Sequence, residues 1–230
     1  MAVKQEIKSQ LAKLLATEDI VVEHKQCETA QFNVETRVLT LPLWEKASND
    51  VYDMLVGHEV GHALFTPNEW GWEDRIPQQF VNVCEDARIE KLMKRKYMGI
   101  AKSFYRGYSE LHDKDFFEVE DEDLSTFNLA DRANLYFKIG SFLDIPFSDV
   151  EKEIIDLIQN AETFTDTLAA AETLYNFCKQ ELQKEKQNQE GDQEDPFQQQ
   201  SPSDSSGTGT SNADSTDNLG SSVSDSDSDA

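Results

Sequence analysis

The stretch "GHEVGHALFTP", residues 57 to 67, constrains the fold of this chain more than any other feature. Residues four apart on a helix project from one face, so His58 and His62 can present two ring nitrogens to a single metal ion. Glu59 would then lie beside that ion, where it could act as a base on a metal-activated water. The competing interpretation is a core helix with two hydrogen-bonded histidines. A metal site would require a second element to pack against this helix and supply a further ligand.

The residues around the motif favour a helix and a metal site. Ser48, Asn49 and Asp50 offer N-cap side chains, and "TP" at Thr66 and Pro67 ends the helical pattern. Glycines at positions 57 and 61 stand where a purely structural helix would favour alanine.

The third ligand is expected from "NVCEDARIE", residues 82 to 90, on the next predicted helix. A catalytic zinc needs three protein ligands and an open position. Glu85 lies on a mostly apolar stripe, where a carboxylate needs a cationic partner, either the metal or Arg88. We expect Glu85 to be the third ligand. Asp86, about 100° further round the helix, is expected to accept the second N–H of a ligating histidine, and is also the alternative ligand.

The remaining elements are mostly helical. Two β-type runs, "DIVVEH" and "AQFNVETRVLTLPLW", predict a small sheet with a hairpin that turns near residues 27–29. Apolar periodicity and capping residues predict helices near the N-terminus and over 48–66, 77–97, 103–112, 129–143, 149–160 and 166–186.

Composition divides the chain into a domain over residues 1–187 and an acidic Ser/Asp-rich tail or linker over 188–230. From Glu190 onward there are ten acidic residues and no Lys or Arg, so we expect this segment to be disordered. The rest still carries 35 acidic against 21 basic residues, which argues against nucleic acid as a partner. Three cysteines without CxxC spacing, and no long apolar run, predict a reduced, cytoplasmic protein that does not enter a membrane.

"HEVGH" followed by a carboxylate on a later helix resembles the gluzincin branch of the zincin metallopeptidases. The longer combination of "GHEVGHALFTP" and "NVCEDARIE" is similar to the metallopeptidase-like N-terminal regions of von Willebrand factor A proteins. Those proteins are related to the cobaltochelatase T subunit and occur in bacteria and large tailed phages. The usual gluzincin pattern has an aspartate four residues after the ligand glutamate, and Ile89 stands there in this chain. Asp86 or Glu90 would have to replace that aspartate, unless Asp86 is itself the ligand.

The resemblance implies an α+β, predominantly helical fold in which a zincin-like active-site helix follows a small sheet. It implies Zn²⁺ held by His58, His62 and Glu85, and hydrolysis of a peptide or protein substrate with Glu59 as general base. The location would be the cytoplasm of a bacterium or of a phage-infected host cell. Such enzymes also use an oxyanion donor, for which the candidates are Tyr105, Tyr108 and His112, although their segment equally fits an ordinary amphipathic helix.

A different class of function stays open. The zinc could only staple two helices of a non-catalytic adaptor, whose acidic tail recruits a MoxR-type AAA+ ATPase. Glu59 distinguishes the two functions, because a structural site has no need of it.

Overall fold

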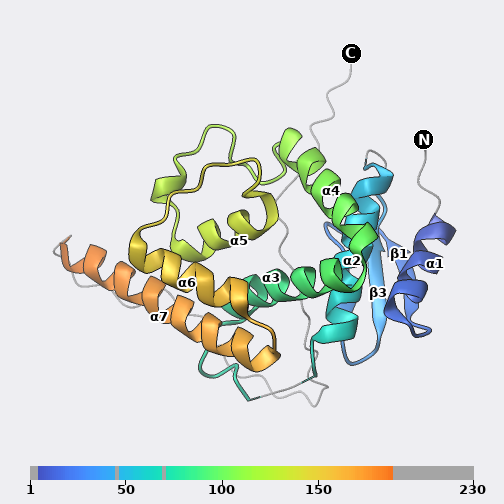
Figure 1. Cartoon of the computed structure of the whole chain (residues 1–230), viewed down its shortest axis with the longest axis horizontal. Coiled ribbons are helices and arrows are strands. Elements are labelled where there is room, and N and C mark those ends of the chain that lie inside the picture. The colour runs from blue at the N-terminus through green and yellow to red at the C-terminus, as the bar shows by residue number, and fades with distance from the viewer. Residues whose placement is uncertain (1–4, 45–46, 69–70, 189–230) are drawn as a thin grey trace, which may run out of the picture.

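The computed structural model describes residues 5–44, 47–68 and 71–188. Within them, one three-stranded sheet lies toward one side of a mostly helical fold (Figure 1). The elements in chain order are α1 (Gln5–Ala16), β1 (Val21–Lys25), β2 (Gln31–Asn33), β3 (Val38–Pro42), α2 (Asn49–Phe65), α3 (Gln78–Lys96), η1 (Met98–Ile100), α4 (Ala101–Asp113), η2 (Leu124–Thr126), α5 (Leu129–Ile139), α6 (Asp149–Asn160) and α7 (Phe164–Asn188). The predominantly helical α+β class is confirmed. The predicted disordered tail lies outside the described residues from position 189 on.

The helix that carries the histidines begins and ends where the sequence indicates. The Ser48 side chain accepts a hydrogen bond from Val51 N at 3.2 Å, and the last turn closes with Thr66 N on His62 O at 3.0 Å. Most of α2 is buried, including every residue from Val51 to Ala63 except Asp53. A helix that is buried nearly all round lies in the interior, so its polar side chains need internal partners.

The sheet has the strand order β1-β3-β2, which differs from the predicted hairpin. Strand β1 pairs with β3 in parallel, and the antiparallel hairpin joins β2 to β3 instead. The turn of this hairpin is made by Asn33, whose side chain accepts from Glu35 N and Thr36 N at 3.0 and 2.7 Å. Arg37 follows with φ 57°, a left-handed conformation that reverses the chain. The predicted turn near residues 27–29 was therefore wrong.

Helix α3 is the central element of the fold. It contacts α2, α5, α6 and α7, and Figure 1 shows it running between the sheet with α1, α2 and α4 and the group formed by α5, α6 and α7. One core cluster fills the space around the sheet and α2, and a second fills the space among α3, α5, α6 and α7. The surface shared by α2 and α3 is therefore internal.

Two glycines of α2 allow its neighbours to approach closely. A Cβ on Gly61 would lie 2.7 Å from Ile89 Cδ1 and 3.2 Å from Met93 Cγ, both on α3. A Cβ on Gly57 would lie 2.6 Å from Ile100 Cδ1. These separations are below the optimal carbon–carbon contact of about 3.5–4.0 Å. The glycines therefore let α3 and the start of α4 pack directly on the backbone of α2.

The other predicted helices are confirmed with small shifts at their ends. Helix α6 has the predicted bounds, α5 stops at Ile139 rather than at residue 143, and α7 begins at Phe164. No helix among the described residues is both long enough and apolar enough to cross a membrane.

Candidate metal centre

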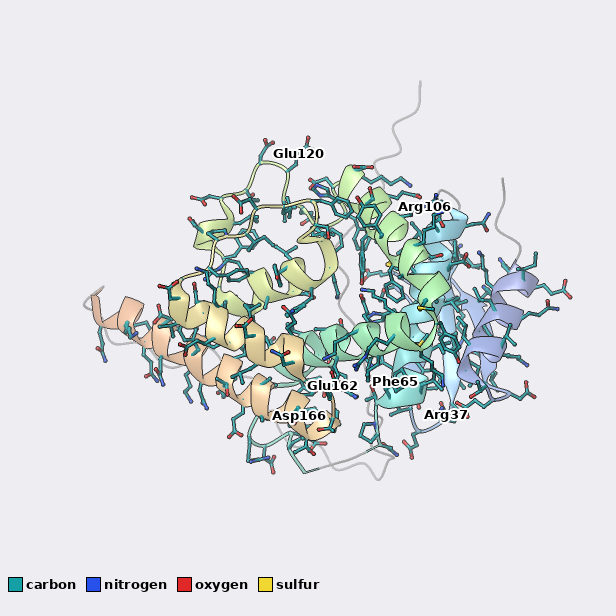
Figure 2. All side chains as sticks on the ribbon, in the orientation of Figure 1. Arg37, Phe65, Arg106, Glu120, Glu162 and Asp166 are labelled. Atoms are coloured by element: carbon teal, nitrogen blue, oxygen red, sulfur yellow. The ribbon has the colours of Figure 1, made fainter. Side chains whose placement is uncertain are left out.

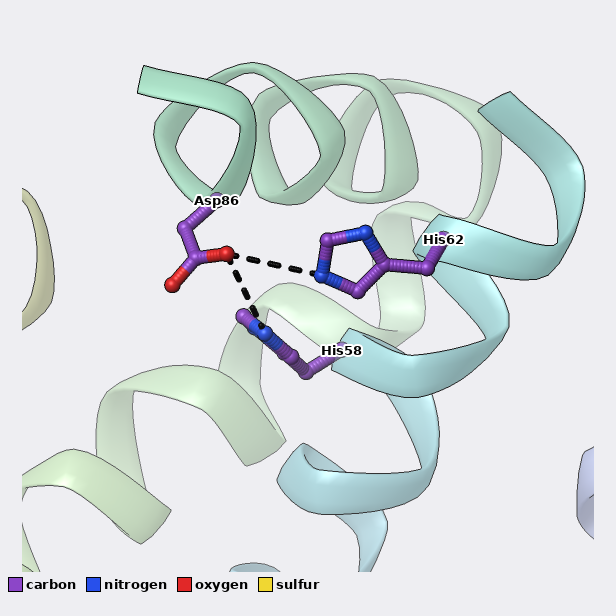
Figure 3. Close-up of side chains that lie close together, drawn as sticks. All are labelled: His58, His62 and Asp86. Carbon is purple, nitrogen blue, oxygen red and sulfur yellow. Dashed lines mark ion pairs between the residues drawn. The ribbon is translucent and has the colours of Figure 1, made fainter. Parts of the chain in front are cut away.

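His58 and His62 of α2 meet Asp86 of α3 in the interior (Figure 3). The Nε2 atoms of His58 and His62 lie 3.6 and 3.4 Å from the same oxygen, Asp86 Oδ1. The three atoms all lie within 4.8 Å of one another. The three residues are 2, 5 and 5% exposed.

These separations suit a shared cation better than direct hydrogen bonds. Hydrogen bonds from nitrogen to oxygen span about 2.7–3.2 Å, so 3.4 and 3.6 Å are too long. Ligands about 2.0–2.1 Å from a tetrahedral zinc lie about 3.3 Å apart, close to both observed values. Among the described residues, no donor hydrogen-bonds to Asp86 Oδ1. A buried carboxylate oxygen in this position is costly unless positive charge lies beside it.

The second ring nitrogen of His58 is held by Glu90. His58 Nδ1 lies 3.0 Å from Glu90 Oε1, and Glu90 also accepts from the Tyr108 hydroxyl and, at 2.9 Å, from Lys94 Nζ. Burial alone would raise the pKa of Glu90, but Lys94, His58 and Tyr108 outweigh it and hold the pKa at about 2. Glu90 therefore lies where it can accept the Nδ1 proton of His58, which leaves Nε2 as the His58 nitrogen that faces Asp86.

The second ring nitrogen of His62 is held through Thr66. The Thr66 hydroxyl donates to Glu85 Oε1 at 2.6 Å, which leaves its oxygen to accept from His62 Nδ1 at 2.9 Å. His62 therefore also carries its proton on Nδ1. The Nε2 atoms of both histidines face Asp86 Oδ1, so three atoms that could bind a metal ion converge there. The residues present thus fit a divalent cation with nitrogen and oxygen ligands.

Glu85, the expected third ligand, is placed elsewhere. Arg88 donates to both of its oxygens, from Nε to Oε2 at 2.8 Å and from Nη2 to Oε1 at 2.6 Å, and Thr167 donates to Oε2 at 3.0 Å. With Thr66, four hydrogen bonds occupy this carboxylate. The structure therefore places Glu85 apart from the two imidazole rings and places Asp86 next to them. Asp86, the alternative, joins the histidines, while Glu85 orients His62 through Thr66.

Arg88 also ties this pair to the surrounding helices. Its Nη2 donates to Phe65 O at 2.8 Å, at the end of α2, and its Nη1 donates to Glu162 O at 3.3 Å, between α6 and α7. Phe65 and Glu162 are labelled in Figure 2, where they lie near each other on one side of α3. Arg88 therefore fixes the carboxylate of Glu85 and links α3 to the end of α2 and to the α6–α7 connection.

Two further charged groups belong to this interior. Glu59, the expected base, is 1% exposed and follows His58 on α2. Lys138 of α5 is 8% exposed, and its Nζ lies 3.0 Å from Asp86 Oδ2, the oxygen that faces away from the histidines. Asp86 therefore presents one oxygen to the histidines and the other to an ammonium group.

The three candidate oxyanion donors are dispersed on α4. Tyr108 is buried, and its hydroxyl donates to Glu90. Tyr105 is 57% exposed, with its ring 5.0 Å from that of Phe142, and His112 stacks on the same Phe142 ring at 5.8 Å. The structure thus brings only Tyr108 toward the histidines, and there it supports Glu90.

Sequence reasoning missed Thr66 and Lys138 and left Glu90 as an open possibility. Thr66 stands four residues after His62 and Glu90 four after Asp86, which is the spacing that places side chains on one helix face. That spacing could have revealed both partners. Lys138 is 52 residues from Asp86 in the sequence and carries no local signal.

Comparisons of the chain with protein-family models, with curated proteins and with solved structures gave no match in any of the three searches. The site must therefore be interpreted from its own geometry.

Proposed function

We propose that this chain is a zinc-dependent hydrolase of peptide bonds, with His58, His62 and Asp86 as the metal ligands and Glu59 as the general base. The observation that carries the proposal is the convergence of two histidine nitrogens on one carboxylate oxygen at 3.4 and 3.6 Å. Two histidines and a carboxylate make the three-ligand set of many catalytic zinc sites, whereas structural zinc usually has four ligands and includes cysteine. The ligand group contains no cysteine among the described residues.

The protein's own groups would prepare the reaction. When bound, zinc supplies a Lewis acid that polarises a carbonyl and lowers the pKa of water. Glu59 would accept a proton from the attacking water and deliver it to the leaving nitrogen. Glu90 and Thr66 hold the Nδ1 protons of the two histidines, so both Nε2 lone pairs stay available without rearrangement.

The change of ligand bears on the resemblance to gluzincins. That pattern expects a carboxylate four residues after the ligand. If Glu85 were the ligand, this position would be Ile89, which has no carboxylate. With Asp86 as the ligand, the fourth residue onward is Glu90, which accepts from His58 Nδ1 at 3.0 Å. The pair of a ligand and its hydrogen-bond partner is thus kept, but both residues are shifted by one position along α3, to Asp86 and Glu90. This spacing supports a gluzincin-like site.

A second function is favoured by one observation, the burial of every ligand. His58, His62 and Asp86 are at most 5% exposed, as expected if the metal only joins α2 to α3. The chain would then be an adaptor, with a MoxR-type ATPase as the partner of its acidic segment after Glu190. This function predicts that removal of residues 190–230 abolishes binding to the ATPase without changing zinc content.

One pair of variants separates the two functions. Glu59→Gln preserves the shape of the side chain but cannot take a proton, so under the hydrolase proposal zinc content and melting temperature stay near the parent while cleavage of a casein substrate is lost. Glu59→Asp keeps the carboxylate but places it farther from the metal site, because the side chain is one methylene shorter. This variant should retain a fraction of the cleavage. Equal cleavage by the parent and Glu59→Gln would remove Glu59 from the reaction. No cleavage by a zinc-loaded parent would favour the adaptor.

A further inference from the structure

Lys138 is a buried cation that faces a proposed metal ligand. Its side chain is 5% exposed, and its Nζ lies 3.0 Å from Asp86 Oδ2. The other oxygen of the same carboxylate, Oδ1, faces His58 and His62 at 3.6 and 3.4 Å. The two oxygens of Asp86 thus have different partners on opposite sides.

Burial of the Lys138 side chain is not needed to pack α5 against the core. Leu129, Ala133 and Ile139 of α5 are at most 2% exposed and already pack in the apolar clusters. A second buried cation of the same helix, Arg132, pairs with Glu151 instead. Burying an ammonium group is costly unless it is paired, so a lysine that reaches Asp86 indicates a role at that carboxylate.

A carboxylate can bind a metal through one oxygen or through both. One-oxygen binding to zinc, with two histidines, leaves a tetrahedral ion with one open position, whereas two-oxygen binding uses a further position. A hydrogen bond from Lys138 to Oδ2 occupies a lone pair of that oxygen and holds it toward α5. Outer hydrogen bonds orient metal ligands in this way.

We propose that Lys138 is a positioning residue that makes Asp86 a one-oxygen ligand and thereby keeps a coordination position free for water or substrate. This inference rests on the metal site of the proposed function and adds to it the coordination number. Lys138 acts through Asp86 and takes no part in the transfer of protons. Its effect is therefore visible in the geometry of the metal even when hydrolysis is not measured.

The test uses Co²⁺ in place of zinc in the full chain. Four-coordinate, tetrahedral Co²⁺ absorbs visible light more strongly than five-coordinate Co²⁺, so the intensity of the visible band reports the coordination number. The parent should show the strong band at one Co²⁺ per chain. Lys138→Met, which keeps an unbranched side chain one atom shorter and removes its donors, should lose most of that intensity at full occupancy because Asp86 Oδ2 becomes free to bind.

The control is Lys8, a second buried lysine among the described residues, which pairs with Asp53 of α2 at 2.6 Å. Lys8→Met removes a comparable ion pair and should keep the strong band. An unchanged band in Lys138→Met would overturn the inference. If Lys138→Met does not fold, the parent still decides, because a weak, five-coordinate band in the parent contradicts one-oxygen binding. A parent that binds no Co²⁺ or zinc refutes the metal site itself, which is a different outcome from bound metal with the wrong geometry.

Discussion

Replacement of Arg88 by methionine tests whether Glu85 is a structural group or a metal ligand. Arg88 and Glu85 are each 3% exposed, and two hydrogen bonds of 2.6 and 2.8 Å join them. Arg88→Met removes both, together with the donors to Phe65 O and Glu162 O. Removing one partner of a buried ion pair leaves an uncompensated charge and costs about 3–5 kcal/mol.

The loss is large relative to the whole stability of a domain, which is about 5–15 kcal/mol. With a urea dependence of about 2 kcal/mol per molar, the unfolding midpoint should fall by about 1.5–2.5 M. Circular dichroism during urea unfolding, with and without zinc, measures it. The double variant Glu85→Gln/Arg88→Met removes the unpaired charge as well and should recover part of the loss, leaving about 1–3 kcal/mol for the carbonyls without donors.

The control is Lys152→Met, which breaks an exposed pair with Asp149 and should cost less than about 1 kcal/mol. The reasoning fails if Arg88→Met is as mild as that control. It also fails if added zinc restores the full stability of Arg88→Met, because a metal ion would then be compensating the charge of Glu85.

Three further outcomes follow from the packing and the charges. Gly61→Ala should lower the melting temperature, because overpacking against α3 costs about 1–3 kcal/mol while the gain in helix propensity is at most about 1 kcal/mol. The control Gly99→Ala, where a Cβ meets nothing within 4 Å, should not lower it. Burial raises the pKa of Glu151, but Arg132 and the Ser148 cap outweigh it, so its net pKa is lowered. The ionised Glu151 therefore stabilises the fold above its ordinary pKa of 4.5, and this stabilisation is lost as the pH falls through its lower pKa in the folded protein. The difference in unfolding free energy between the parent and Glu151→Gln should accordingly shrink below about pH 4.5. A thiol reagent should label only Cys27 in the native protein and three thiols after unfolding, because the other two cysteines are buried.

The sequence predicted the helices well because their signals are local. Caps such as Ser48 and the i, i+4 spacing of His58 and His62 depend on residues within one or two turns. The strand pairing was not local. Strand β1 joins β3 across the whole β2 hairpin, and nothing near residues 27–29 shows that.

Which carboxylate of α3 faces the two histidines depends on how α3 is rotated against α2, which is a matter of packing. Ile89 and Met93 pack against Gly61. Asp86 lies three residues before Ile89 and seven before Met93, on the same face of α3, so this contact directs it toward the histidines. Glu85 is about 100° away and faces the α6–α7 connection, where Arg88 meets it. Adjacent residues of similar chemistry cannot be distinguished by periodicity when both faces of a helix are buried.

The most direct test of the account is zinc titration of the purified chain and of two matched variants, Asp86→Asn and Glu85→Gln, with folding checked by circular dichroism. The account predicts one zinc per parent chain and loss of most of that zinc in Asp86→Asn. Glu85→Gln, which acts on His62 only through Thr66, should retain zinc with a Kd raised about 10- to 100-fold. The reverse order of the two variants, or a parent that retains no zinc, would contradict the assignment of His58, His62 and Asp86 as the metal centre.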